Sequence, residues 1–270
     1  MPESSPSLLK CADLTVDVAG RMLVDTLALE LRPGQFIAVL GKNGSGKTLT
    51  LKTLAGLRPF TTGKISLAGR DLQSLRRSEV ARNLALLTQH DEDAFPATVL
   101  ETVLVGRHPH IRPFQWESRT DLRLAREALA MVDLQGLEER IVATLSGGER
   151  RRLAIAQVLA QQPKIYLLDE PANHLDPQHE LDILALFRKI TQRGGAVIAS
   201  LHDVNLAARF ADQCLLLFGD GQWLLGPSAD VLNEENLSRL YATRIQAIEW
   251  QGRRFFMTTG GLEPAIDKAS

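Results

Sequence analysis

The sequence predicts an α/β protein with a mostly parallel, helix-covered sheet, an N-terminal antiparallel β subdomain and an inserted α-helical subdomain. Three observations support this prediction. Strands and helices alternate after residue 163, β-forming residues dominate the N-terminus, and the pattern between residues 90 and 162 is mostly helical. With 270 residues, 44% of them hydrophobic, the chain is long enough to bury a substantial core.

The N-terminal third begins with two β-rich segments, 8–18 and 22–31, separated by Ala19-Gly20. A short connection between two such segments favours a hairpin. A turn at Pro33-Gly34 precedes a short apolar strand, 35–40, which is followed by a glycine-rich loop and a helix from about 48 to 57. We therefore expect the α/β core to start with a strand-loop-helix unit.

The rest of the chain separates into three parts. In the helical part, Leu122, Ala125, Leu129 and Val132 recur at spacings of three and four, as on one face of a helix. Later elements are expected at 165–168 (strand), 178–191 (helix), 196–201 (strand), a short helix, 214–218 (strand), a hairpin turn at 219–221, and a helix-and-strand appendage over 237–258. We predict one domain, with a core of 1–89 and 163–235, a helical subdomain of 90–162, and an appendage of 236–270.

Composition restricts the class of partner. The chain has 31 basic and 32 acidic side chains, so its overall charge does not suggest a nucleic-acid partner. Cys11 and Cys214 lie far apart and match no metal spacing, which is typical of small core residues in a reducing compartment. The N-terminus does not resemble a signal peptide, and no apolar run approaches the roughly 18 residues of a membrane-spanning helix. We therefore expect any membrane association to depend on a partner.

The first chemical motif has the pattern GxxxxGK[ST] between the predicted strand and helix. Its residues are Gly41, Lys42, Asn43, Gly44, Ser45, Gly46, Lys47 and Thr48. Glycines let backbone N–H groups surround phosphate oxygens, and the helix N-terminus adds partial positive charge. Lys47 is expected to reach the β- and γ-phosphates, and the Thr48 hydroxyl to coordinate Mg²⁺. The motif predicts a nucleotide site.

A second motif follows the predicted strand 165–168, which is apolar at every position, as in a sheet covered on both faces. Asp169 and Glu170 come at its carboxyl end, where an open α/β sheet binds its ligands. We expect Asp169 to hold Mg²⁺ and Glu170 to polarise an attacking water as general base.

A third motif, 145–149 (LSGGE), precedes a predicted helix over 150–162. The nucleotide site of the same chain does not account for it. Ser146, Gly147 and Gly148 are suited to the N-cap of that helix, so an ordinary capping turn is one interpretation.

The three motifs, in this order and spacing, resemble the Walker A, signature and Walker B motifs of ATP-binding cassette (ABC) ATPases, and the resemblance covers roughly residues 8–226. It implies the ABC ATPase fold with its P-loop NTPase core, ATP and Mg²⁺ as cofactors, and a head-to-tail homodimer. In such a dimer Ser146 and the N–H groups of Gly147 and Gly148 contact the γ-phosphate held by the partner chain.

Four further positions follow from the resemblance. Gln89 corresponds to the Q-loop glutamine, which links Mg²⁺ and the water to the membrane-domain contact. His202 resembles the switch histidine at the γ-phosphate, and Asp176 the D-loop aspartate that crosses to the partner; Asp176 before Pro177 is also a good helix start. Val18 falls where the family usually has an aromatic residue stacked on adenine. Valine cannot stack, so either apolar contact remains or another residue covers the base.

The basic run Arg150 to Arg152 is expected to be mostly a solvated helix face. Segments such as 171–184 and 200–217 resemble the ATPases of importers for iron-siderophore, haem and cobalamin. This resemblance implies a peripheral protein at the cytoplasmic face of the inner membrane, bound to two permease subunits that receive substrate from a binding protein.

The permease contact would be a groove over about 89–107. Either its apolar residues line the groove or they serve ordinary helix packing; these residues are Ala94, Phe95, Pro96, Val99 and Leu100.

The alternative function is a soluble ABC ATPase acting on DNA or ribosomes, but such proteins tend to carry a long coiled-coil insertion or two cassettes, and neither is present. A P-loop kinase or GTPase would lack the glycine signature, and the sequence has no NKxD motif.

Overall fold

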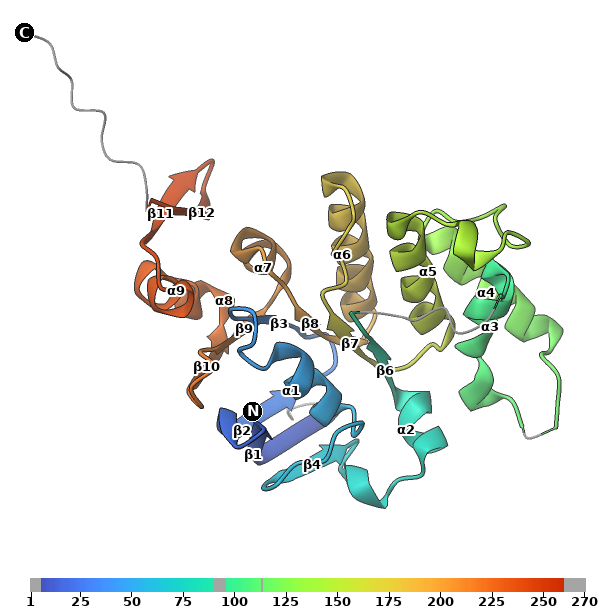
Figure 1. The fold of residues 1–270 in the computed structure, drawn as a ribbon, viewed down its shortest axis with the longest axis horizontal. Coiled ribbons are helices and arrows are strands. Elements are labelled where there is room, and N and C mark those ends of the chain that lie inside the picture. Colours follow the sequence, from blue (N-terminus) through green and yellow to red (C-terminus); the bar gives the residue numbers. More distant parts are fainter. Residues whose placement is uncertain (1–5, 90–95, 113, 260–270) are drawn as a thin grey trace, which may run out of the picture.

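The computed structural model describes residues 6–89, 96–112 and 114–259, and its centre is a six-stranded sheet (Figure 1). The strand order is β10-β9-β3-β8-β7-β6. These strands are β3 (Phe36–Leu40), β6 (Leu84–Leu87), β7 (Ile165–Asp169), β8 (Ala196–Ser200), β9 (Gln213–Leu217) and β10 (Trp223–Pro227). Strands β6, β7, β8, β3 and β9 are parallel, and β10 pairs antiparallel with β9. The predicted α/β fold with a mostly parallel sheet is confirmed.

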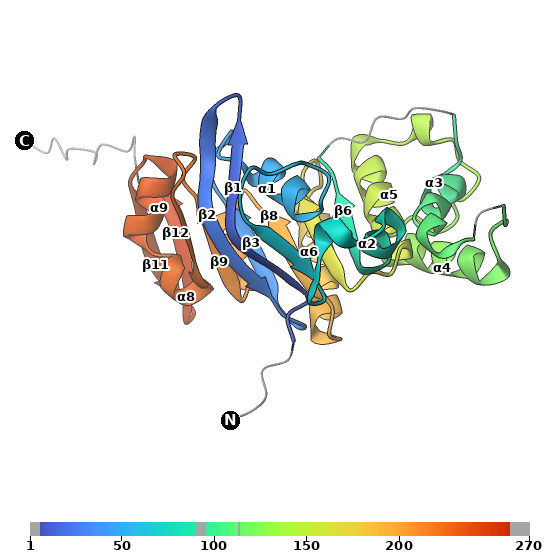
Figure 2. The same ribbon diagram turned by 90° about the horizontal axis from the view of Figure 1, so that it is seen from below.

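A second, antiparallel sheet packs over one face of the central sheet (Figure 2). Its strand order is β2-β1-β4-β5. The strands are β1 (Leu9–Val18), β2 (Arg21–Leu31), β4 (Lys64–Leu67) and β5 (Arg70–Asp71). The predicted hairpin is confirmed as β1 and β2. The sequence analysis did not place β4 or β5, because strands of four and two residues are too short to show a period.

Two hydrophobic cores lie on the two faces of the central sheet, since alternate side chains of each strand point to opposite faces. In β7, Tyr166 and Leu168 pack toward the helical side, whereas Ile165 and Leu167 pack toward the antiparallel sheet. Helix α1 (Lys47–Leu54) lies on the second side, and α6 (Pro177–Gln192) and α7 (Val204–Phe210) on the first. Cys11 and Cys214 are both buried with free thiols, as expected of small core residues.

The helical region packs beside the β6 edge of the sheet (Figure 1). Its helices are α3 (Val99–Val105), α4 (Arg119–Met131) and α5 (Gly147–Ala160), with 3₁₀ turns at His108–His110 and Val142–Thr144. Arg107 joins them, since its guanidinium pairs with Asp121 of α4 at 2.9 Å and donates to the carbonyl of Ala160 of α5 at 2.7 Å. The predicted apolar face of α4 is present, with Ala125 and Leu129 fully buried.

The C-terminal appendage lies beyond β10. It contains α8 (Ser228–Val231), α9 (Glu234–Tyr241), β11 (Ile245–Trp250) and β12 (Arg253–Thr258). Asn205 of α7 ties it to the core, because its side chain donates to the carbonyl of Phe256 at 3.1 Å and accepts from that residue's N–H at 2.8 Å. A helix-and-strand appendage was predicted here. No helix in the described part of the chain has the length and apolar character needed to cross a membrane.

Helix boundaries differ from the prediction in places. Helix α1 ends at Leu54 rather than near 57, because Gly56 adopts the left-handed region (φ 67°) and stops it. Helix α2 (Arg77–Asn83), preceded by a 3₁₀ turn at Leu72–Ser74, was not predicted. The division of the chain at residues 89, 162 and 235 stays a prediction.

Candidate active site

The glycine-rich loop connects the end of β3 to the start of α1. Gly44 and Gly46 have φ values of 77° and 104°, which side-chain-bearing residues rarely adopt. A Cβ added at Gly41 would lie 2.3 Å from Ser45 Oγ and 2.7 Å from the carbonyl oxygen of Leu217. The loop therefore needs glycine both for its backbone turns and for its close packing.

Lys47 lies at the first position of α1 and is largely buried. Its Nζ donates to the carbonyl oxygens of Gly41 (2.8 Å) and Lys42 (3.3 Å). Burial lowers the pKa of Lys47, an effect that the nearby Glu170 and Asp169 oppose. The buried Ser45 hydroxyl has no hydrogen-bond partner among the described residues. A buried cation and an unsatisfied hydroxyl on an N–H-rich loop fit a phosphate group.

Asp169, at the end of β7, lies beside the loop. Its Oδ2 accepts a hydrogen bond from the Thr48 hydroxyl at 2.6 Å, and its Oδ1 accepts one from the Ser200 hydroxyl at 2.7 Å. The Thr48 hydroxyl and the Asp169 carboxylate thus form an adjacent pair of oxygen atoms, the donor type that Mg²⁺ prefers. These two residues fit the metal-binding role predicted for them.

Glu170 is the centre of a second set of contacts. Its Oε1 lies 2.6 Å from His202 Nε2, and its Oε2 accepts hydrogen bonds from Gln89 Nε2 (2.8 Å) and Asn173 Nδ2 (3.2 Å). The backbone of Glu170 is in the left-handed region, with φ 50°. Its N–H donates to Ser200 Oγ at 2.8 Å. The structure therefore brings together Glu170, Gln89 and His202, the three residues predicted to be catalytic.

Arg151 corrects the expectation that residues 150–152 form a solvated face. Its guanidinium is buried and donates to four backbone carbonyls. The accepting residues are Thr88, Asp169, Glu170 and Pro171. Its neighbours Arg150 and Arg152 also donate to carbonyls, those of Ala143 and Val132 among them. The run thus holds the start of α5 against its surroundings, and Arg151 connects α5 to residues 169–171.

A cavity of about 450 Å³ opens over the glycine loop. Its wall consists of Val18, Leu23, Asn43, Gly44, Gly46, Lys47, Thr48, Leu49, Gln89, Glu170, Asn173 and His202. Val18 is 42% exposed and lies at this cavity with Leu23, so both offer apolar contact and neither offers a ring. Ser146, Gly147, Gly148 and Asp176 do not line it.

The glycine turn before α5 is a helix N-terminus. The Ser146 hydroxyl accepts from the Glu149 N–H (3.2 Å), and the Glu149 carboxylate accepts from the Ser146 N–H (2.7 Å), which forms a capping box. A Cβ added at Gly147 would meet no atom within 4 Å. Asp176 is the N-cap of α6, and its carboxylate accepts from the His179 N–H at 3.0 Å. In a single chain, therefore, both motifs cap helices, and the turn at Gly147 is open to its surroundings.

The predicted permease groove is only partly described. Ala94 and Phe95 lie outside the described residues. Val99 does not line a groove, because it is fully buried in the core of the helical region, where α3 packs on α4 and α5. Leu100 packs against the same core, and Pro96 is exposed.

Sequence reasoning missed two further polar residues at the site, Ser200 and Asn173. Ser200 is fully buried at the end of an apolar strand, where a polar side chain next to the predicted metal site was a usable signal. Asn173 follows Glu170 by three residues, and no spacing rule identifies it.

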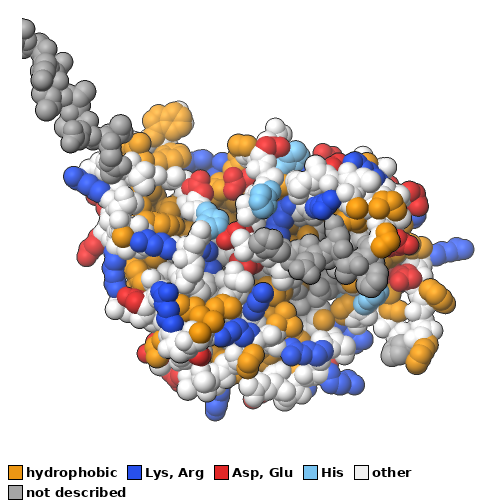
Figure 3. All heavy atoms as spheres, viewed as in Figure 1, with side chains coloured by type: hydrophobic (Ala, Val, Ile, Leu, Met, Phe, Trp, Pro, Cys, Tyr) orange, Lys and Arg blue, Asp and Glu red, His pale blue; other side chains and the backbone are white. Residues whose placement is uncertain are grey.

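Basic, acidic and hydrophobic side chains are interspersed over the face shown in Figure 3.

Comparison with known proteins decides the family. The family model described as "ABC transporter" matches residues 24–173, more than half of the chain. This chain belongs to the ABC transporter family. Its ATP-binding cassette carries an ATPase fold, and the chain is an ATPase. The predicted resemblance and fold class are confirmed.

Relatives with high similarity cover most of the chain. A protein of Gloeobacter violaceus named "Hemin import ATP-binding protein HmuV" is 44% identical over 233 residues, which are 83% of each chain. A protein of the same name from Rhizobium meliloti is 36% identical over 88% of this chain and 93% of its own. Among solved structures, an inward-facing metal-chelate type ABC transporter superposes with a TM-score of 0.80 at 28% identity, covering 93% of this chain and 96% of that one.

Proposed function

We propose that this ABC ATPase powers the import of haem or a related metal chelate through a membrane permease, with Glu170 as the general base of ATP hydrolysis. The contacts of Glu170 carry the proposal. One carboxylate faces His202, Gln89 and Asn173 at the mouth of a cavity built on a phosphate-binding loop. A carboxylate held by three polar side chains beside a phosphate site is suited to orient a water for attack.

The residues at the cavity have separate roles in this proposal. The loop N–H groups and Lys47 bind the β- and γ-phosphates of ATP, and the Ser45 hydroxyl, which lacks a partner in the described chain, adds a donor. Thr48, Asp169 and Gln89 hold Mg²⁺, which supplies positive charge against the phosphate oxygens. Glu170 accepts the proton of the attacking water, and His202 holds Glu170 and contacts the γ-phosphate. Val18 and Leu23 make apolar contact with the adenine ring.

The proposed active form is a head-to-tail homodimer. Ser146, Gly147 and Gly148 lie outside the cavity of their own chain, and the N-terminus of α5 is open at Gly147. In a dimer they can supply N–H groups and the helix dipole to the γ-phosphate of the partner's site. Asp176 would approach the same interface. A dimeric bacterial ABC transporter cassette, MJ0796, superposes with a TM-score of 0.72 at 26% identity over 82% of this chain and 98% of that one, which supports this arrangement.

The cargo is proposed from the names of the relatives. Proteins 44% and 36% identical to this chain are named for hemin import, and a structural neighbour is described as a metal-chelate type transporter. Haem therefore ranks above ferric siderophore and cobalamin. The proposal places the chain at the cytoplasmic face of the inner membrane, held there by permease subunits that receive cargo from a binding protein.

Growth of a deletion strain tests the cargo and the chemistry together. A strain of the source organism that lacks this gene should fail to grow with haemin as the iron source, and the wild-type gene should restore growth. A gene carrying Glu170→Gln should not. Normal growth of the deletion strain on haemin, with loss of growth only on ferric siderophore or only on supplied cobalamin that growth requires, would reassign the cargo. Growth unaffected on all three would contradict an importer.

A further inference from the structure

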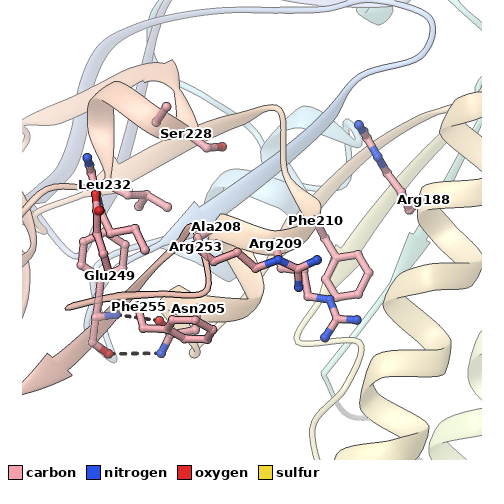
Figure 4. A pocket seen from close by; sticks show the side chains of 14 residues that line it. Arg188, Asn205, Ala208, Arg209, Phe210, Ser228, Leu232, Glu249, Arg253 and Phe255 are labelled. Atoms are coloured by element: carbon pink, nitrogen blue, oxygen red, sulfur yellow. Dashed lines mark hydrogen bonds between the residues drawn. The ribbon is translucent and has the colours of Figure 1, made fainter. Parts of the chain in front are cut away.

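A second cavity, of about 700 Å³, lies between the ATPase core and the C-terminal appendage (Figure 4). Side chains from α6, α7 and α8 form one side of it, and the β11–β12 hairpin forms the other. The volume falls within the range of small-molecule sites, roughly 300–1,000 Å³. Nothing in the ATPase chemistry described above uses this cavity.

The polar part of the wall is strongly basic. Arg188, Arg209, Arg253 and Arg254 contribute to it, against one acid, Glu249. Arg188 is already neutralised, because its guanidinium forms a two-bond pair with Asp212 at 2.7 and 2.8 Å. Within the described chain no ion pair joins Arg209, Arg253 or Arg254 to an acidic side chain. Glu249, the cross-strand partner of Arg254, offsets one of the three remaining arginines, so the cavity wall still carries a net positive charge.

The remaining wall is apolar and partly aromatic. It includes Ala208, Phe210, Leu232, Phe255 and Phe256. Arg209 lies over the Phe210 ring at 5.3 Å from its centre, which leaves the edge of the guanidinium available for hydrogen bonds. Arginines beside aromatic and aliphatic surface suit a ligand that has a flat apolar body and carboxylate groups at its edge.

The cavity is also connected to the catalytic histidine. Helix α7 begins at Val204, two residues after His202, and the Asp203 side chain caps it. Asn205 of the same helix holds β12 through both polar atoms of the Phe256 backbone. A ligand bound between α7 and the hairpin would restrain the segment that carries His202.

We infer that this arginine-lined cavity binds a flat dicarboxylate of the haem type, and that its occupancy lowers the ATPase rate by restraining α7. The choice of haem among such molecules rests on the proposed function. Haem and its metal-free parent have an apolar ring system with two carboxylates on one edge. The ring suits the apolar and aromatic part of the wall, and the carboxylates suit its arginines. Accumulated cargo of the proposed importer would thus inhibit the ATPase that drives its import.

Binding to the purified full-length protein tests the inference. The probes are protoporphyrin IX, its dimethyl ester, which keeps the ring but has no carboxylates, and inorganic phosphate, which has charge without a ring. We expect the dicarboxylate to bind at least about tenfold more tightly than the ester, since each charge-assisted hydrogen bond is worth a factor of about ten. Equal affinity of diacid and ester, or no binding of the diacid, would overturn the inference.

Paired variants locate the site. Arg253→Gln with Arg254→Gln should weaken protoporphyrin binding at least about tenfold. Arg119→Gln with Arg126→Gln removes the same charge from the exposed face of α4, remote from the cavity, and should leave binding unchanged. Without porphyrin both double variants should hydrolyse ATP at the wild-type rate, which also shows that they fold. Equal weakening by the two pairs would mean non-specific attraction and overturn the site.

The ATPase rate tests the second half of the inference. Porphyrin should slow ATP hydrolysis by the wild type and by the α4 double variant, but not by the β12 double variant. An unchanged wild-type rate at saturating porphyrin would refute regulation through α7. The growth assay on haemin depends on Glu170 and not on Arg253 or Arg254. If porphyrin does not bind the cavity, the proposed function still stands on the growth assay. If the growth assay fails, the binding measurements still show whether the cavity binds porphyrin.

Discussion

His202 Nε2 and Glu170 Oε1 lie 2.6 Å apart, although the two residues come from the ends of different strands of the central sheet. The contact depends on the order of those strands. Because β7 and β8 are parallel neighbours, their carboxyl ends meet at one edge, and β3 delivers the phosphate loop to the same edge. The geometry proposed for catalysis is therefore a consequence of sheet topology, and its parts can be tested singly.

Replacement of Glu170 by glutamine keeps the size of the side chain and removes its basicity. ATP hydrolysis should fall at least about a hundredfold, the usual contribution of a positioned base, while ATP binding is retained. Steady-state turnover and nucleotide binding measure the two effects, and size-exclusion chromatography should detect an ATP-bound dimer. Glu127→Gln, at an exposed position of α4, is the control and should turn over normally. Wild-type turnover by the Glu170 variant would refute the assigned base.

Replacement of Ser146 by alanine tests the role of the glycine turn in a dimer. Loss of the helix cap alone should cost about 1 kcal/mol of stability. Thr98→Ala is a matched control, because Thr98 forms the same capping box at the start of α3. Both variants should lose similar stability in thermal unfolding. Only Ser146→Ala should reduce ATP hydrolysis, by at least about tenfold, with nucleotide binding to the single chain retained. Equal ATPase rates in the two variants would leave Ser146 with a capping role alone.

Arg151→Met should destabilise the protein and slow hydrolysis together. The change leaves the carbonyl groups of four residues, Asp169 and Glu170 among them, without the buried donor that they have now. A loss of about 3 kcal/mol in the free energy of unfolding is expected, to be measured by urea denaturation. Arg150→Met, at an exposed position, should cost less than about 1 kcal/mol. The same small cost at both positions would contradict a connection between α5 and residues 169–171.

The Arg107–Asp121 pair predicts a dependence of stability on pH. Burial opposes ionisation of Asp121, but the hydrogen bonds from Ser118 and the Arg107 guanidinium outweigh it and lower the pKa from 3.8 to about 2. A depressed pKa stabilises the folded state fully above the unfolded value, and this stabilisation is lost as the pH falls through about 2.

Asp121→Asn should therefore lose stability relative to wild type at pH 7, and the difference should shrink between pH 4 and pH 2. Unfolding at a series of pH values measures it. A difference that stays constant over this interval would exclude the carboxylate charge as its source.

Motif spacing and apolar runs predicted the elements on which the site depends, because a buried parallel strand and a phosphate loop both impose local patterns. Contacts between residues that lie far apart in the sequence impose no local pattern, so the sequence did not predict them. Arg151 was expected in solvent on its charge, although it precedes the buried Ile155 by four residues and so shares its helix face. Ser200 contacts Asp169 of the neighbouring strand, which only the folded sheet brings together, whereas Asn173 contacts Glu170 within one loop whose conformation no spacing rule predicts. For Val99 the sequence left groove lining and helix packing open, because apolar character does not tell which neighbour a side chain meets; the structure shows helix packing.

The separation of Ser146 from the cavity of its own chain has a genetic consequence. Suppose one copy carries Glu170→Gln and the other Ser146→Ala, each with strongly reduced turnover by itself. In a mixed pair both defects fall in the same composite site, and the opposite site combines an intact carboxylate with an intact serine. Mixing the two variants in equal amounts should thus restore up to about a quarter of wild-type turnover. Half of the randomly formed dimers are mixed, and each mixed dimer has one intact site out of two. Complementation between two lesions in one gene would be the signature of a shared reaction centre.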